Sequence, residues 1–113
     1  MDALVLLQGE VSFPFEWLGD LTGLELTFII TDQTKTVVQI NGAGLWLLNG
    51  KPAPGELGKI IIEDLLNGCG TVVLYEAAVK QLSDEYQWQA RLCTQTGRVL
   101  WRQILIPAVV NGV

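Results

Sequence analysis

The sequence predicts an all-β fold, a small antiparallel meander of six to seven short strands that closes into a barrel or folds into a sandwich. Three observations support this prediction. Apolar residues recur with a period of two near the C-terminus, the same period appears between residues 24 and 40, and turn-forming residues separate the other apolar segments. We therefore expect helix to be minor.

The C-terminal part of the chain predicts a β-hairpin. Apolar and polar side chains alternate through residues 86–94, which is the pattern of a strand with one buried face. The alternation breaks at Thr96-Gly97, a turn signal, and then resumes. We expect Trp88 and Trp101 to anchor the core from this hairpin.

A second hairpin is predicted in the first half of the chain. Apolar residues alternate from 24 to 30, a polar turn follows at 32–35, and a β-branched strand returns at 36–40. Closer to the N-terminus, Pro14 interrupts an apolar run. Proline has no amide hydrogen to donate, so we expect that segment at the edge of a sheet.

The middle of the chain gives mixed signals. Asn49-Gly50 is a strong turn signal, but Pro52 and Pro54 favour a loop over a returning strand. Three successive isoleucines favour a strand through Ile62. Leu57, Ile61 and Leu65 recur at helical spacing, which favours a helical turn after it.

The prediction for this region is a strand followed by at most one short helix near residues 60–67. Residues 71–79 are mostly apolar and predict a further strand. Together with the C-terminal hairpin, that strand would give three sequential up-and-down strands.

Length and composition indicate a single domain, residues 1–113, with a core that needs neither metal nor disulfide. Half of the residues are apolar and only 17% are charged. Soluble domains usually carry about 25% charged residues, so this lower fraction indicates a surface that a partner covers in part. A surface coated with glutamine and threonine is the alternative.

The charge balance disfavours nucleic acids and anionic membranes as partners. Twelve carboxylates oppose seven Lys and Arg residues, the net charge is −5, and no basic run exists. The sequence has no apolar run long enough to span a bilayer and no basic residue before its first apolar run. We expect a cytoplasmic protein, peripheral at most to the cytosolic side of a membrane complex. A homo-oligomer is possible.

Catalytic equipment is sparse. The chain has no histidine, which removes the commonest general base and metal ligand. Neither serine lies in a nucleophile elbow, and no glycine-rich loop has the spacing of a phosphate site. Cys69 and Cys93 are isolated and fit small core residues better than a disulfide. We expect no enzymatic activity, cofactor or metal.

The acidic pairs Glu63-Asp64 and Asp84-Glu85 are interpreted as solvated turn charges. Neighbouring residues of a strand point to opposite faces, so neither pair converges on a substrate unless the backbone turns there.

Arg91, Arg98 and Arg102 lie together on the predicted C-terminal hairpin. We expect Arg98 and Arg102 on one face of their strand and Arg91 across from them. Arginine among apolar neighbours is typical of a protein-docking surface, whereas three solvated arginines on an outer face are the plain alternative. Among the four tryptophans, Trp46 is the expected exposed one, because it follows a flexible glycine-rich segment.

These features favour a small non-catalytic accessory subunit that docks on a larger protein complex. An extrinsic subunit on the soluble side of a membrane-bound electron-transfer assembly would fit the size and the missing catalytic residues. The alternative is a small β-barrel that binds an apolar ligand in a cavity lined by Trp46, Phe28 and Trp88.

Overall fold

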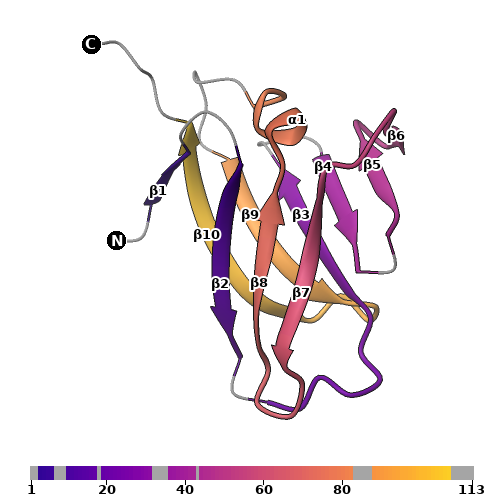
Figure 1. Ribbon diagram of the computed structural model, residues 1–113, viewed down its shortest axis with the longest axis vertical. Coiled ribbons are helices and arrows are strands. Elements are labelled where there is room, and N and C mark those ends of the chain that lie inside the picture. Colours follow the sequence, from indigo (N-terminus) through magenta and orange to yellow (C-terminus); the bar gives the residue numbers. More distant parts are fainter. Residues whose placement is uncertain are drawn as a thin grey trace.

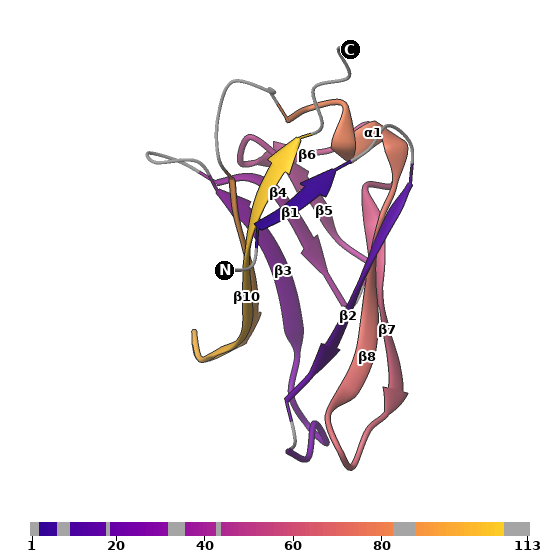
Figure 2. The same cartoon turned by 90° about the vertical axis from the view of Figure 1, so that its left-hand side faces the viewer.

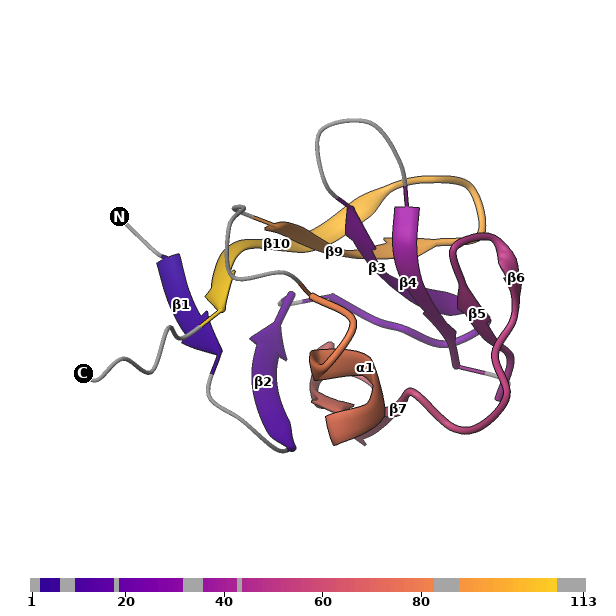
Figure 3. The same cartoon turned by 90° about the horizontal axis from the view of Figure 1, so that it is seen from above.

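Two β-sheets face each other in the computed structural model of the chain (Figure 1). The structure describes residues 3–6, 10–17, 19–31, 36–42, 44–82 and 88–107. The two layers are separate in the side view, and a short helix lies at one end of the sandwich (Figures 2 and 3). The all-β sandwich predicted from the sequence is confirmed, and the sheets do not close into a barrel.

The larger sheet has seven strands and the smaller has three. In spatial order the larger contains β1 (Ala3–Leu6), β10 (Val99–Pro107), β9 (Trp88–Thr94), β3 (Leu26–Thr31), β4 (Thr36–Asn41), β5 (Trp46–Leu48) and β6 (Lys51–Pro52). In spatial order the smaller contains β2 (Val11–Glu16), β8 (Cys69–Leu74) and β7 (Gly58–Asp64). The helix is α1 (Glu76–Val79).

Both predicted hairpins are present, β3 with β4 and β9 with β10. β2 is an edge strand, as expected from Pro14. The chain order is not a simple meander, because β9 pairs with β3 and β1 pairs in parallel with β10. The described residues also form ten strands instead of six to seven. Pairing between distant segments produces these differences, and it leaves no local signal in the sequence.

The loop predicted after Asn49-Gly50 is partly wrong. Both residues have positive φ, 53° and 81°, as a type I′ hairpin turn requires. Lys51 and Pro52 then pair with β5 as the short strand β6. β6 is the last strand of its sheet, so Pro52 needs no amide hydrogen on the open side.

The helix expected near residues 60–67 is also wrong. β7 continues to Asp64 and is followed by a turn. The described helix is instead α1, which lies inside the segment predicted as a strand over 71–79. β8 ends at Leu74, where the chain leaves the smaller sheet. Ala78 of α1 is fully buried at the end of the sandwich.

The core lies between the sheets. Phe13 of β2, Phe28 of β3 and Trp101 of β10 form an aromatic cluster, with ring centroids 5.9–6.0 Å apart. Trp88 is 4% exposed, and Trp101 is half-buried against the same cluster. The prediction that these two tryptophans anchor the core is confirmed. Burial of a large apolar side chain stabilises the fold by roughly 1.5–3 kcal/mol.

Three predicted features lie outside the described residues: the turn at 32–35, the acidic pair Asp84-Glu85, and the start of the alternating pattern at Tyr86 and Gln87. Within the described ranges, no helix has the length and hydropathy needed to cross a membrane.

Candidate protein-docking face

A β-bulge decides where the arginines of β10 lie. The register of β10 against β9 shifts between Val99 and Trp101, so β10 carries one extra residue there. One extra residue moves the side chains before it to the opposite face of the sheet. The expectation that Arg98 and Arg102 share a face is therefore wrong.

Arg98 belongs to the inner side of the sandwich. Its guanidinium carbon lies 4.9 Å from the ring centroid of Trp17, which follows β2 in the smaller sheet. A cation over an aromatic face at this distance contributes about 0.5–1 kcal/mol at an exposed site. Arg98 thus links one end of the two sheets and does not join the other arginines.

Arg91 and Arg102 lie directly opposite each other on the outer face of the larger sheet. The register continues across β3, β4 and β5 through Ile29, Gln39 and Leu47. We call these five residues the arginine row. Their neighbours along β3 and β9 are buried in the core, which confirms that the row faces away from it.

An apolar residue adjoins the row. Ile104 lies one pleat beyond Arg102 on the same face, opposite Gln89, and is 38% exposed. Ile29 and Leu47 in the row are half-buried. The face therefore combines two guanidinium groups with accessible apolar area, the composition that protein interfaces favour.

The two arginines have no counter-charge among the described residues. Neither Arg91 nor Arg102 forms an ion pair within the described ranges, and Nε of Arg91 is buried without a hydrogen-bond partner there. Like charges directly opposite each other destabilise a sheet. A buried donor without an acceptor costs about 1–3 kcal/mol. A carboxylate supplied from outside would relieve the repulsion between the two guanidinium groups.

The expectation that Trp46 is the exposed tryptophan is wrong, because its side chain is half-buried and packs against the core. Its indole Nε1 donates to the carbonyl oxygen of Gly58 at 2.8 Å, which joins β5 of the larger sheet to β7 of the smaller. This bond gives Trp46 a structural role between the sheets. It lies at the far side of the larger sheet from Arg91 and Arg102.

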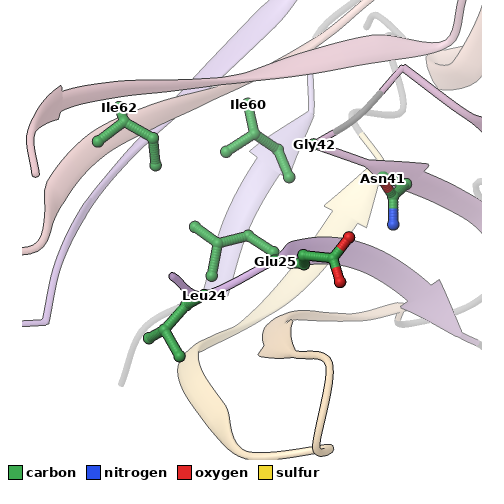
Figure 4. A pocket seen from close by; sticks show the side chains of 7 residues that line it. Leu24, Glu25, Asn41, Gly42, Ile60 and Ile62 are labelled. Carbon is green, nitrogen blue, oxygen red and sulfur yellow. The ribbon is translucent and has the colours of Figure 1, made fainter. Parts of the chain in front are cut away.

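A pocket of about 280 Å³ opens between β3 and β7 (Figure 4). It is lined by Leu24, Glu25, Leu26, Asn41, Gly42, Ile60 and Ile62. None of the aromatics expected to line a ligand cavity is among them. Phe28 and Trp88 are instead packed in the core.

The described residues contain no cluster of three or more His, Cys, Asp or Glu side chains that could hold a metal ion. Glu63 and Asp64 have different hydrogen-bond partners. The Glu63 carboxylate accepts from the Thr71 hydroxyl at 3.1 Å, and Asp64 accepts from the backbone and side-chain nitrogens of Asn67. Both carboxylates are exposed, as predicted, but they belong to strand β7 and not to a turn.

The two cysteines are free. Cys93 is buried, whereas Cys69 is half-buried and its sulfur lies 3.7 Å from a carboxylate oxygen of Glu16. Burial raises the pKa of the Cys69 thiol above its ordinary value, and the negative charge of Glu16 raises it further. The reactive thiolate is therefore disfavoured at neutral pH.

Alkylation of Cys69 by iodoacetamide is expected to rise only at a pH above the ordinary range for a cysteine, because the thiolate is the nucleophile. Glu16→Gln removes one negative charge and should move the midpoint of the rate profile to lower pH. Mass spectrometry of the Cys69 peptide measures this rate. Glu56→Gln, which changes the same charge elsewhere, should leave the midpoint in place; equal shifts in both variants would contradict the assignment to Glu16.

The sequence matches no protein-family model, and no curated protein is significantly similar to it.

The sequence did not indicate the rest of the arginine row. Ile29, Gln39 and Leu47 come from strands far from Arg91 in the chain, and only the pairing of β3 with β9 brings them together. The hairpin alternation does place Arg91 and Arg102 on a polar face. It does not show the bulge that places Arg98 on the opposite face of the sheet from Arg102.

Proposed function

We propose that this protein is a non-catalytic interaction subunit that docks on a larger protein assembly through the arginine row. The observation that supports the proposal most is the opposed pair of Arg91 and Arg102, which has no counter-charge among the described residues. Such a pair costs stability in the free domain and becomes favourable when a carboxylate binds between the guanidinium groups.

The partner surface that fits this face carries carboxylates beside apolar side chains. Carboxylates would pair with Arg91 and Arg102, and apolar groups would cover Ile29 and Ile104. Arginine forms planar two-pronged hydrogen bonds with carboxylates and loses less hydration than lysine on burial, so it suits a desolvated contact. The net charge of −5 leaves this row as a local exception on an acidic protein.

Several broader features of the chain fit an accessory role. It is small, lacks histidine and has few charged residues for its size. An extrinsic subunit on the soluble, cytosolic side of a membrane-bound electron-transfer assembly is the specific form of this proposal. Its partner would then be an acidic surface of that assembly.

Arg102→Glu tests the arginine row through two measurements, a gain in the stability of the domain and a loss of partner binding. The isolated domain should gain roughly 0.2–1 kcal/mol of stability, because attraction to Arg91 replaces repulsion across the strands. The gain should shrink in high salt. Capture of a partner by the tagged chain under native conditions should be lost, since the partner's carboxylates then meet a negative charge. Urea denaturation and quantitative mass spectrometry of captured proteins measure the two effects.

Lys51→Glu is the matched control, because it makes the same charge change at an exposed residue of β6. It should leave both the stability and the set of captured proteins unchanged. Capture that persists in the Arg102→Glu variant would remove the arginine row as the docking face. Destabilisation of the isolated domain by Arg102→Glu would contradict the opposed geometry.

A further inference from the structure

β7 forms an open edge of the smaller sheet. β8 pairs with one side of it, and no other described strand pairs with it. The first residue is covered, because Trp46 donates to the carbonyl of Gly58. Between residues 60 and 64, the open side makes no backbone hydrogen bond with a described residue, and the next bond is from the amide of Leu21 to the carbonyl of Leu65, just after β7.

The backbone groups of Ile60 and Ile62 face this open side. The amide of Tyr75 donates to the carbonyl of Leu57 at 2.9 Å, so the backbone of Leu57 faces β8. Hydrogen-bonding direction alternates along an antiparallel strand. Ile60 and Ile62 therefore face the other way, as Gly58 does. Their N–H and C=O groups are available to another strand.

The inner face of this edge is apolar. Ile60 and Ile62 point from β7 towards Leu24, which precedes β3 (Figure 4). Leu26, the first residue of β3, also lines this pocket. Ile62 remains 38% exposed. A strand added to β7 would lay its alternate side chains over the mouth of this pocket.

The charges on the outer face of the edge are complementary to those of a second, antiparallel copy of the same strand. Lys59 and Ile61 project from this face, and Ile61 is 37% exposed. Glu63 is the extra residue of a β-bulge, since Ile62 pairs with Gly70 and Asp64 with Cys69. Its carboxylate still lies on the outer face, beside Thr71, which is the partner of Ile61. The Thr71 hydroxyl donates to the Glu63 carboxylate and holds it in place. Opposite charges thus lie on either side of a central isoleucine, Lys59 before it and Glu63 after it.

An antiparallel pair of two β7 strands centred on Ile61 pairs the open backbone groups, the inner isoleucines and the outer charges at the same time. Ile60 then lies opposite Ile62 of the second copy, and the open N–H and C=O groups of each pair bond reciprocally. In the same register, Lys59 lies opposite Glu63 of the second copy. A parallel pair in register would place like charges opposite each other, which disfavours it.

We propose that two copies of this chain associate through β7, antiparallel and centred on Ile61, and join their smaller sheets into one continuous sheet. The interface is two-fold symmetric, since each copy offers the same edge. Ile62 of each copy covers the pocket mouth of the other. The dimer removes an open apolar edge that would otherwise promote aggregation.

This proposal is independent of the arginine row. The row lies on the outer face of the larger sheet, whereas β7 belongs to the smaller sheet. A β7 dimer leaves both copies of the row accessible, so failure of one proposal does not affect the other.

The test is sedimentation of the purified chain across a concentration series. The expected result is a species of twice the 12.4 kDa chain mass that dissociates on dilution. Lys59→Glu and Glu63→Lys should each raise the dissociation constant on the order of tenfold or more, because each puts like charges opposite each other twice. An equal mixture of the two single variants should recover the dimer as a heterodimer, and the double variant should recover it alone.

The charge-swap pattern separates self-association from other occupants of the edge. A chain that stays monomeric at all concentrations, as expected if β7 accepts only a strand of another protein, overturns the proposal. So does a dimer that ignores both charge reversals. Circular dichroism of each variant establishes that the fold is intact.

A cysteine cross-link provides a second measurement of the same register. Ile61→Cys should form an intermolecular disulfide on mild oxidation, because the two copies of that residue face each other in a non-hydrogen-bonded pair with close Cα atoms. Lys59→Cys lies off the two-fold axis and should cross-link far less. Equal cross-linking of the two variants would exclude a register centred on Ile61.

Discussion

Phe28→Ala is expected to lower the free energy of unfolding by about 3–5 kcal/mol, the largest effect of any substitution considered for this fold. Phe28 is fully buried at the centre of the sandwich, stacked on Phe13 and tilted against Trp101. The rings come from both sheets, so alanine leaves a cavity that neither sheet can close alone. Urea denaturation followed by tryptophan fluorescence measures the loss.

Two further variants keep this prediction testable if Phe28→Ala does not fold. Phe28→Leu removes less volume and should give a smaller loss in the same direction. Ile29→Ala alters the adjacent residue of β3, which faces outwards and is half-buried, and should cost much less than Phe28→Ala. Equal losses at the two positions would contradict the assignment of Phe28 to the core.

Gly70→Ala is expected to destabilise the fold by about 1–3 kcal/mol, although alanine in a strand is normally favourable by about 0.5–1 kcal/mol. Gly70 lies in the central strand of the smaller sheet. A Cβ there would overlap the carbonyl oxygen of Ile61 and lie 2.6 Å from Cζ of Phe15. The carbonyl belongs to a paired strand and cannot move without loss of ladder hydrogen bonds. The substitution should therefore lower the stability of the fold.

Gly55→Ala is the matched control for this glycine. Its added Cβ would meet nothing within 4 Å, and its backbone is not in the left-handed region. It should leave stability unchanged or raise it slightly by restricting the unfolded chain. Similar thermal melting of the Gly70→Ala and wild-type proteins would show that β8 and β7 are not packed as the structure has them.

The candidate site shows how far local pattern extends. Alternation in the hairpin places Arg91 and Arg102 on a polar face, and the structure brings them directly opposite each other. The bulge before Trp101 was not predictable, because a bulge adds one residue without changing the composition of the strand. The prediction that Trp46 is exposed was wrong for a related reason, since Gly58, the hydrogen-bond partner of its indole, lies in a different sheet.

The sequence by itself determined the fold class, both hairpins, the edge position of Pro14 and the two tryptophans of the core. Each depends on a period or a backbone preference that acts over a few neighbouring residues. Only the tertiary structure decided which strands share a sheet, where the helix forms and which side chains join Arg91 on the outer face. Those outcomes depend on pairing between segments far apart in the chain. Hydrophobic burial stabilises such pairing, but no short sequence pattern encodes it.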